Sequence, residues 1–254
     1  MKIISWNING FRAIIKKDFK KTINELNPDI LCLQEVKAKE KQLTSDEINI
    51  EGYSYIWNAA ERLGYSGTAT YYKNNFKPDE TKIGFNIPEF DNEGRVICTR
   101  YGDIDLYNIY FPNGQRGMDR VDYKIQFYET LLQICNEDHK RGRKIIISGD
   151  FNTAHTEIDL ANPKENENYS GFLKVERDMI TKYLESNFVD VYRSLNPDKV
   201  KYTWWTYRFA ARARGIGWRI DYCLVSQDLL LRIKNVEILD LIQGSDHCPV
   251  VLEI

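Results

Sequence analysis

The sequence predicts an α/β protein in which helices pack against a mixed β-sheet, as a two-layered sandwich with its polar turns along one rim. Strand-like and helix-like segments alternate at residues 2–33 and again at 104–150, each with the length of a strand–helix–strand unit. Between these units, short apolar and aromatic runs follow one another closely, separated by Gly, Asn and Pro. Strands spaced this closely pair antiparallel, so we expect a mixed sheet.

The first strand–helix–strand unit begins at the N-terminus. Residues 2–6 have the apolar pattern of a strand, and a second strand is expected over 30–33. Apolar residues at helical spacing predict one helix over 11–26, which Asn27 and Pro28 would end. The apolar residues of this helix are Phe11, Ile15, Phe19, Ile23 and Leu26.

Short strands dominate the middle of the chain. Each is an apolar or aromatic run of four to seven residues that is bounded by turn-forming residues. The expected strands are 53–57, 67–72, 82–85, 95–100 and 104–110.

The second half of the chain repeats the strand–helix–strand plan. A helix over 119–140 has an apolar stripe that is most simply explained by core packing, and it leads into a buried strand that contains Ile145, Ile146 and Ile147. A further helix is expected near 175–186. The last expected strands are 189–191, 220–225 and 249–254.

Length and composition indicate one globular domain over residues 1–254. The apolar content of 43% is enough for a full core, and no apolar run approaches the length of a membrane span. The N-terminus enters strand-like sequence at once and lacks the apolar region of a signal peptide, so we expect a cytoplasmic protein, associated with the nucleoid if the source is a prokaryote. The five cysteines are widely spaced, which predicts buried reduced thiols.

Charge is distributed unevenly along the chain. The net charge is −2, but residues 199–220 contain six basic side chains and no acidic one, so this segment carries +6 and the remainder −8. A basic patch on an acidic body is what a protein needs if it binds a phosphate backbone and also holds a metal ion. The basic residues are Lys199, Lys201, Arg208, Arg212, Arg214 and Arg219.

Polar residues follow the predicted strands at the points where these strands end. Each has an ordinary explanation as a turn or helix-cap residue, and for Asp150 and Asn152 alone a cap and a catalytic pair are about equally good explanations. Several such groups on strands of one sheet are harder to explain as turns. Oxygen ligands without clustered Cys or His favour a hard cation, for which Glu35 is the first choice, supported by Asn7 or Asp246. The strand-end residues are Asn7, Glu35, Tyr110, Asn113, Asp150, Asn152, Asp221, Asp246 and His247.

Six motifs in order along the chain resemble the exonuclease III family of apurinic/apyrimidinic (AP) endonucleases. The resemblance implies a DNase I-like, four-layered α/β sandwich and Mg²⁺-dependent hydrolysis of a DNA phosphodiester, with Mn²⁺ as a substitute ion. GDFN or SDH alone would indicate only the wider endonuclease/exonuclease/phosphatase superfamily. The motifs are SWNING (5–10), LQEVK (33–37), YFPNG (110–114), GDFNTAH (149–155), GWRIDY (217–222) and GSDHCP (244–249).

The resemblance also implies roles for the strand-end residues. Glu35 is the expected metal ligand with Asn7 beside it, and Asp246 is either a ligand or a support. Asp150 would orient or deprotonate the attacking water, assisted by Asn152. His247, polarised by Asp221, would donate to a phosphate oxygen. Tyr110 would be a further donor or a proton-transfer group. Positioned donors of this kind stabilise the charge that develops in attack at phosphorus.

Basic and aromatic residues alternate over 201–219, a pattern that can neutralise phosphates and receive bases or sugars, although some rings must belong to the core. By resemblance, Trp204, Trp218 and Ile220 match positions that line a pocket for an extruded abasic sugar. Arg208 occupies the position of an apolar wedge in other family members. The expected backbone-contacting residues are Asn113, Arg116 and Asn166.

Three functional hypotheses follow. The first is a monomeric repair endonuclease that cuts 5′ to an abasic site in duplex DNA, with the proportion of 3′–5′ exonuclease, 3′-phosphodiesterase or phosphatase, and damaged-base (for example uracil) incision left open. The second keeps the metal chemistry but acts on a phosphoinositide, a sphingolipid or undamaged nucleic acid. The third is a non-catalytic DNA-binding module, which the intact set of acidic residues and His247 disfavours. The absence of GxSxG and GxxxxGK[ST] motifs argues against a serine hydrolase and a nucleoside-triphosphate enzyme.

Overall fold

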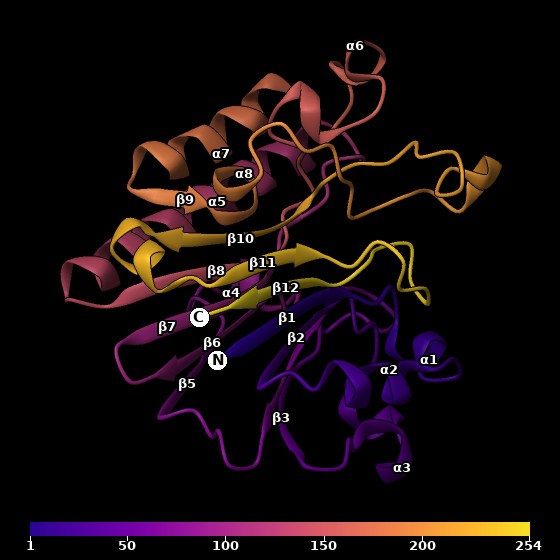
Figure 1. Ribbon diagram of the computed structural model, residues 1–254, viewed down its shortest axis with the longest axis vertical. Coiled ribbons are helices and arrows are strands. Elements are labelled where there is room, and N and C mark those ends of the chain that lie inside the picture. The colour runs from indigo at the N-terminus through magenta and orange to yellow at the C-terminus, as the bar shows by residue number, and fades with distance from the viewer.

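Two six-stranded sheets lie face to face between outer layers of helices (Figure 1) in the computed structural model, which describes residues 1–254. The four-layered α/β sandwich that the family resemblance implied is confirmed. The two-layered arrangement expected from the strand pattern is wrong, because the predicted strands divide between two sheets.

The first sheet is formed by both ends of the chain. The two central strands, β1 and β2, are parallel to each other, and every other pair of adjacent strands in this sheet is antiparallel. In spatial order the strands are β11 (Asn235–Ile238), β12 (Val250–Glu253), β1 (Lys2–Asn7), β2 (Ile30–Gln34), β4 (Thr68–Lys73) and β3 (Tyr53–Asn58).

The second sheet has the same plan. Its central strands β7 and β8 are parallel and the others are antiparallel. The two parallel pairs are the two strand–helix–strand units expected from the sequence. In spatial order the strands are β5 (Glu80–Ile83), β6 (Val96–Tyr101), β7 (Ile104–Tyr110), β8 (Lys144–Asp150), β10 (Asp221–Ser226) and β9 (Phe188–Asp190).

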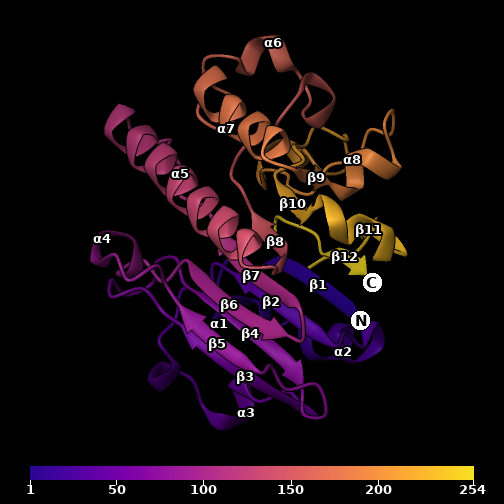
Figure 2. The ribbon, with the colours of Figure 1, turned by 90° about the vertical axis from the view of Figure 1, so that its left-hand side faces the viewer.

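The helices cover the outer face of each sheet (Figure 2). The longest, α5 (Met118–Lys140), lies on the second sheet beside α7 (Lys174–Glu185), whereas α8 (Val191–Leu195) packs against β10 and β11 at the edge of the two sheets. The first sheet is covered by α1 (Phe11–Ile14), α2 (Phe19–Leu26) and α3 (Ser45–Ile48). Short helices in loops complete the list: α4 (Pro88–Asp91), α6 (Pro163–Asn166) and 3-10 turns at Glu40–Gln42, Glu157–Asp159, Arg208–Ala210 and Gln227–Arg232.

Apolar residues on both faces of the central strands hold the four layers together. In β8, Ile145 and Ile147 belong to the core under α5, while Ile146 belongs to the core between the two sheets. In β1, Ile3 faces the other sheet and Ile4 faces the outer helices. Each fully buried aliphatic side chain of this size contributes about 1.5–3 kcal/mol.

Two local expectations are wrong. The helix expected over 11–26 is broken into α1 and α2, and the break allows Phe19 to pack against both Phe11 and Trp6, with ring centroids 5.9 and 5.8 Å apart. Strand β11 was not expected, because only Val236 and Ile238 alternate with polar residues there. These are cases in which tertiary packing overrides the local pattern.

Polar side chains cross the interface between the sheets near one end. Gln34 Nε2 donates to Ser5 Oγ at 3.0 Å and to Asn108 Oδ1 at 2.8 Å, and Asn108 belongs to the opposite sheet. Because buried polar groups require partners, these bonds fix the relative position of the sheets at this end. The same end carries the residues described below.

All five cysteines are buried and free, as expected. No helix combines the length and the hydropathy needed to cross a membrane.

Candidate active site

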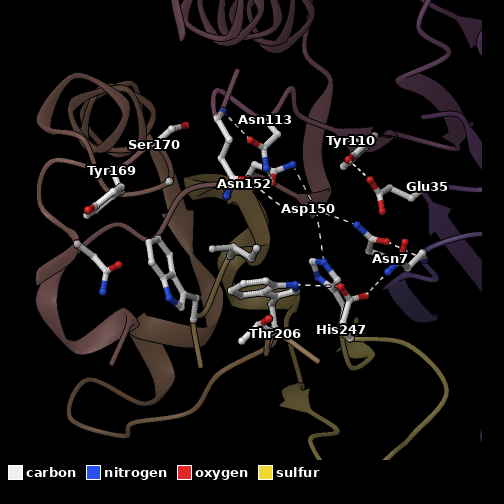
Figure 3. Close-up of a pocket in the computed structure, with 18 of the residues that line it drawn as sticks. Asn7, Glu35, Tyr110, Asn113, Asp150, Asn152, Tyr169, Ser170, Thr206 and His247 are labelled. Atoms are coloured by element: carbon white, nitrogen blue, oxygen red, sulfur yellow. Dashed lines mark hydrogen bonds and ion pairs between the residues drawn. The ribbon is translucent and has the colours of Figure 1, made fainter. Parts of the chain in front are cut away.

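A cavity of about 660 Å³ opens where the ends of the two sheets meet (Figure 3). All fifteen of the residues predicted to form the site lie at or near it, and all except Asp221, Arg116 and Arg208 line it directly. The expectation that these residues follow strands of one sheet is wrong, because Asn7 and Glu35 follow strands of the first sheet, whereas Tyr110 and Asp150 end strands of the second.

Three adjacent strands of the second sheet end in register. Tyr110 pairs with Asp150 across β7 and β8, and Asp150 pairs with Asp221 across β8 and β10. A Cβ atom on Gly149 would lie 1.8 Å from the Ile109 carbonyl oxygen, so only glycine permits this approach of β8 to β7. The residue before Asp150 therefore helps to fix its carboxylate beside Tyr110.

Asp150 is almost completely buried, with 1% of its surface exposed. Its Oδ2 accepts a hydrogen bond of 2.8 Å from Asn7 Nδ2, and its Oδ1 accepts one of 2.8 Å from the Asn152 backbone amide. Burial raises the pKa of Asp150, the charge of His247 opposes this shift, and the nearby Asp221 adds to it. A carboxylate whose pKa is raised is suited to accept a proton near neutral pH.

His247 lies between two carboxylates. Its Nδ1 is 2.8 Å from Asp221 Oδ2, and its Nε2 is 3.8 Å from Asp150 Oδ2. Burial alone would lower the pKa of His247, but Asp221 and Asp150 outweigh it and raise the pKa to about 10. The imidazole is therefore held in its charged form, with Nε2 directed toward the cavity.

Asn152 adopts a left-handed backbone conformation, with φ of 51°. Its Nδ2 donates to the Phe111 carbonyl oxygen at 2.9 Å, and its Oδ1 accepts from Asn113 Nδ2 at 3.1 Å. These bonds direct the carboxamide into the cavity beside Asp150 (Figure 3).

Glu35 faces Asp150 from the other sheet. Its Oε1 accepts a hydrogen bond from the Tyr110 hydroxyl, and its Oε2 lies 3.1 Å from Lys37 Nζ. Burial and the charge of Glu35 raise the pKa of Tyr110 well above its usual value, although Arg95, stacked 4.6 Å from the ring centroid, opposes the shift. Tyr110 therefore keeps its proton at neutral pH, which favours a donor over a proton-accepting group.

Asp246 is fixed by its neighbours rather than free in the cavity. Its Oδ1 accepts from Asn9 Nδ2 at 2.9 Å and from Ser245 Oγ at 3.1 Å, and its Oδ2 accepts from Trp204 Nε1 at 3.2 Å. Asn9 also accepts a hydrogen bond of 2.5 Å from Lys37. This geometry links Asp246 to the wall of the cavity.

The donors around Glu35 fit a hard divalent cation. The nearby groups are carboxylate and carboxamide oxygens, and every cysteine lies elsewhere in the core. The Lys37 ammonium beside Oε2 shows that this oxygen is accessible to a positive charge. A second group of possible metal ligands consists of Asp150, Asp221 and His247, whose ligand atoms all lie within 4.8 Å of one another.

The predicted sugar pocket lies within the same cavity as Glu35. Trp204 and Trp218 meet edge to face, with centroids 6.3 Å apart, and Trp218 meets Phe172 in the same way. Ile220 packs in the same cluster, and Asn166 stands at its edge. An apolar pocket therefore adjoins the polar group formed by Asp150 and His247.

The predicted basic patch is smaller than its sequence suggested. Arg219 is buried and bonded to Asp159 and Asp190, and Arg212 donates to backbone carbonyl oxygens, so neither is free to meet a phosphate. Arg208 and Arg116 are exposed beyond the rim of the cavity, where Arg116 lies over the Tyr65 ring.

Several residues of the cavity were missed from the sequence. Asn9 and Lys37 belong to quoted motifs but had no assigned role, while the segment 169–171 follows no strand and gave no signal. The missed lining residues are Asn9, Lys37, Gln115, Ala161, Asn162, Tyr169, Ser170, Gly171, Thr206 and Ile216.

Comparison with known proteins agrees with this geometry. Residues 4–247 match the model of the Endonuclease/Exonuclease/phosphatase family. The chain belongs to this family. An exodeoxyribonuclease of Bacillus subtilis is 45% identical, with 100% of this chain and 99% of that protein covered. A DNA-(apurinic or apyrimidinic site) endonuclease of Dictyostelium discoideum is 41% identical, with 98% of this chain and 69% of that protein covered.

Solved structures of similar fold include two of special interest. An AP endonuclease from Archaeoglobus fulgidus matches with a TM-score of 0.88 and 29% identity, covering 100% of this chain and 98% of that one. A 3′ phosphatase from Neisseria bound to a product DNA hairpin matches with a TM-score of 0.90 and 28% identity, covering 100% and 98%. The resemblance to the exonuclease III family is confirmed, and this member of the endonuclease/exonuclease/phosphatase family is a phosphodiester hydrolase that, like the rest of its family, depends on divalent metal.

Proposed function

We propose that this hydrolase cuts the phosphodiester 5′ to an abasic site in duplex DNA, as a monomer and with Mg²⁺. One observation carries the proposal: the polar group of Asp150 and His247 adjoins an apolar pocket walled by Trp204, Trp218 and Ile220. A phosphate held by the polar group would place the adjoining sugar in this pocket. A sugar without a base fits there once it leaves the stack.

Asp150 acts as the base that removes a proton from the attacking water. Its carboxylate is oriented by Asn7 and by the Asn152 amide, and its raised pKa brings proton transfer near neutral pH. The Asn152 carboxamide, fixed by Phe111 and Asn113, holds the water or a phosphate oxygen in line.

His247 and Tyr110 donate to the phosphate. The charged imidazole, fixed by Asp221, presents Nε2 to a non-bridging oxygen whose negative charge grows during attack. Tyr110, whose single hydroxyl proton is donated to Glu35 in the free protein, would redirect this hydrogen bond to the phosphate from the opposite side. His247 is set before the substrate arrives, which lowers the reorganisation needed in the transition state.

Glu35 would hold the Mg²⁺ ion, with Asn7 beside it and Asp246 as a support through Asn9. When bound, the ion supplies positive charge that stabilises the phosphate and the leaving oxygen. The protein's part is to keep the Glu35 carboxylate rigid through Tyr110 and Lys37.

Duplex DNA is the partner that the surroundings favour. The relatives from Dictyostelium and Archaeoglobus are named for action at abasic sites and as an AP endonuclease, and the Neisseria structure contains a DNA product. Arg116 and Arg208 are exposed beyond the cavity, where they would contact phosphates on either side of the lesion, together with Asn113 and Asn166 at the rim.

A second activity, removal of 3′ phosphates or nucleotides, uses the same groups. The Neisseria neighbour is named as a 3′ phosphatase, and the Bacillus relative as an exodeoxyribonuclease. Damaged-base incision would require the pocket to admit a nucleotide that still carries its base.

The first test is cleavage of an end-labelled duplex with one central abasic site, in Mg²⁺ and in EDTA. Matched duplexes carry a normal base, a uracil, a recessed 3′ end or a 3′ phosphate. Mg²⁺-dependent incision 5′ to the abasic site is the expected result, and the other duplexes rank the side activities. Cleavage of inositol or sphingolipid phosphates without cleavage of any duplex would overturn the proposal.

A further inference from the structure

An ion pair is completely buried behind the active site. Lys124 on α5 and Glu176 on α7 lie 2.7 Å apart, Nζ to Oε1, and both side chains are 0% exposed. Moving two charges into the interior carries a large desolvation cost, and a well-packed apolar pair is often as stable. Stability alone therefore does not account for the pair.

The lysine end of this pair is joined to the catalytic group. Lys124 Nζ donates a 2.7 Å hydrogen bond to the backbone carbonyl oxygen of Asn152. Asn152 has a φ of 51°, in the left-handed region that residues with a side chain adopt rarely and asparagine more readily than most. The bond from Lys124 holds the Asn152 peptide in this conformation, and the conformation directs the Asn152 carboxamide into the cavity.

The glutamate end is joined to the cavity wall. Glu176 Oε1 accepts from Ser170 Oγ at 2.8 Å, and Oε2 accepts from the Gly171 backbone amide at 2.6 Å. Ser170 and Gly171 both line the cavity. A Cβ on Gly171 would lie 3.0 Å from Trp218, so the backbone there packs directly against the sugar pocket.

We propose that Lys124 and Glu176 are a positioning pair, which sets the catalytic Asn152 and the Ser170–Gly171 wall of the sugar pocket relative to each other. The inference rests on the proposed function, and neither residue reaches the cavity itself. Because Asn152 would hold the attacking water or a phosphate oxygen in line, a displacement of about 1 Å would slow the reaction on the order of 100-fold. Ground-state binding of the duplex depends on the rim and changes little.

The decisive variant is Lys124→Met with Glu176→Gln. It removes both charges, so no unpaired charge is left in the interior. The glutamine oxygen can still accept from the Gly171 amide, so, apart from the bond within the pair, the bond lost is the one from Lys124 to the Asn152 carbonyl. Should the double variant fold poorly, the isosteric variant Glu176→Gln tests the glutamate end of the pair with the smallest change in volume: it keeps the Lys124 bond to Asn152 but removes the charge that holds Lys124 in place, so the same loss of rate at unchanged Kd is expected.

We expect the single-turnover rate of abasic-site incision in Mg²⁺ to fall roughly 10- to 100-fold in the double variant. The Kd for the same duplex in EDTA should stay at the wild-type value, at a temperature where circular dichroism shows each protein folded. The loss should also be non-additive with Asn152→Ala, because a pair that acts through Asn152 has nothing left to position once that side chain is removed.

A solvent-exposed ion pair between the same two helices provides a matched control. Lys182 on α7 and Glu129 on α5 lie 3.0 Å apart with 50% and 51% exposure, and Lys182→Met should leave the rate unchanged. A wild-type rate in the folded double variant, or a loss fully additive with Asn152→Ala, would overturn the positioning role. Failure of the wild-type protein to cut the abasic duplex would instead overturn the proposed function.

Discussion

Nε2 of His247 lies 3.8 Å from Oδ2 of Asp150. Asp150 ends β8 in the second sheet, whereas His247 lies in the loop that leads into β12 of the first sheet. At this distance Nε2 makes no hydrogen bond to Asp150, so it remains available to donate to a phosphate while the charge of the imidazole stays close to the proposed base. Water and phosphate would therefore meet between an acceptor and a donor that are both fixed in advance.

Replacing Asp150 by Asn should nearly abolish turnover, because the amide cannot accept the proton of the attacking water. We expect a loss on the order of 100-fold or more in the single-turnover rate. Duplex affinity in EDTA should stay close to that of the wild type, because the substitution keeps the shape of the side chain. Near-normal turnover would show that another group is the base.

Replacing Asp221 by Asn should slow incision by roughly 100- to 10,000-fold. The 2.8 Å bond from His247 loses its charged acceptor, and the pKa of His247, which Asp221 raises, must fall. The pH–rate profile measures this: its basic limb should move to lower pH in the variant. A profile that keeps its basic limb would exclude His247 as the charged donor.

Replacing Arg208 by Ala should weaken duplex binding more than it slows chemistry. The side chain is exposed outside the cavity, so its charge and stacking contribute to binding, by about 5- to 30-fold in Kd. The salt dependence of the Kd should become shallower by about one unit of slope. Arg141→Ala, at the other end of α5 from the site, is the matched control, and an unchanged Kd for Arg208→Ala would refute the contact.

Replacing Glu35 by Gln should raise the Mg²⁺ concentration for half-maximal rate on the order of 10- to 100-fold or more, because the metal loses its charged ligand. A Mg²⁺ titration of the incision rate measures this directly. Glu40→Gln, whose carboxylate instead bonds Tyr55 at the surface, should leave the titration unchanged. Equal titrations for the wild type and Glu35→Gln would require a different ligand.

Replacing Asp159 by Asn should destabilise the protein at neutral pH. Burial raises the pKa of this carboxyl group, but Arg219 and Arg193, which bond to it, outweigh burial and lower the pKa to about 2. A lowered pKa stabilises the fold above the unfolded pKa of about 3.9, by roughly 2–3 kcal/mol, and this contribution is lost as pH falls through 2. Urea unfolding at pH 7 and near pH 2 measures this. The difference in unfolding free energy between the wild type and Asp159→Asn should be smaller near pH 2 than at pH 7.

The matched control for that measurement is Asp178→Asn. Asp178 pairs with Lys174 on the exposed face of α7, where an ion pair contributes little. The unfolding free energy of the Asp178→Asn variant should equal that of the wild type at both pH values. An Asp159→Asn gap that stays constant with pH would show that packing, and not charge, accounts for the loss.

Much of the site could be predicted from the sequence, because a polar residue directly after a buried strand is a local signal. Asp150 after Ile145–Ile147 and Tyr110 at the end of β7 are examples, and both line the cavity. The two facing sheets could not be predicted in this way. Strands that are apolar on both faces, such as β8, carry no indication of which neighbour covers which face.

Contacts between charged residues that are distant in the sequence were also beyond the sequence pattern. Lys124 lies in a helix whose apolar stripe suggested plain core packing, and its partner Glu176 is 52 residues away. Arg219 was counted as surface charge, yet it is buried between Asp159 and Asp190. Charged residues in the interior have no periodic signature, because their partners are brought together only by tertiary structure.

The pairing of β1 with β12 has a consequence for folding kinetics. Ser5 lies opposite Val250, so the centre of one sheet depends on a contact between segments about as far apart in sequence as the chain allows. Contacts between residues so far apart in the sequence form slowly during folding. Until β12 arrives, β1 is an unprotected edge, and His247, just upstream of β12, is not yet opposite Asp150. The hydrolytic centre should therefore mature in the last step of folding, and refolding followed by activity should lag behind refolding followed by helix content.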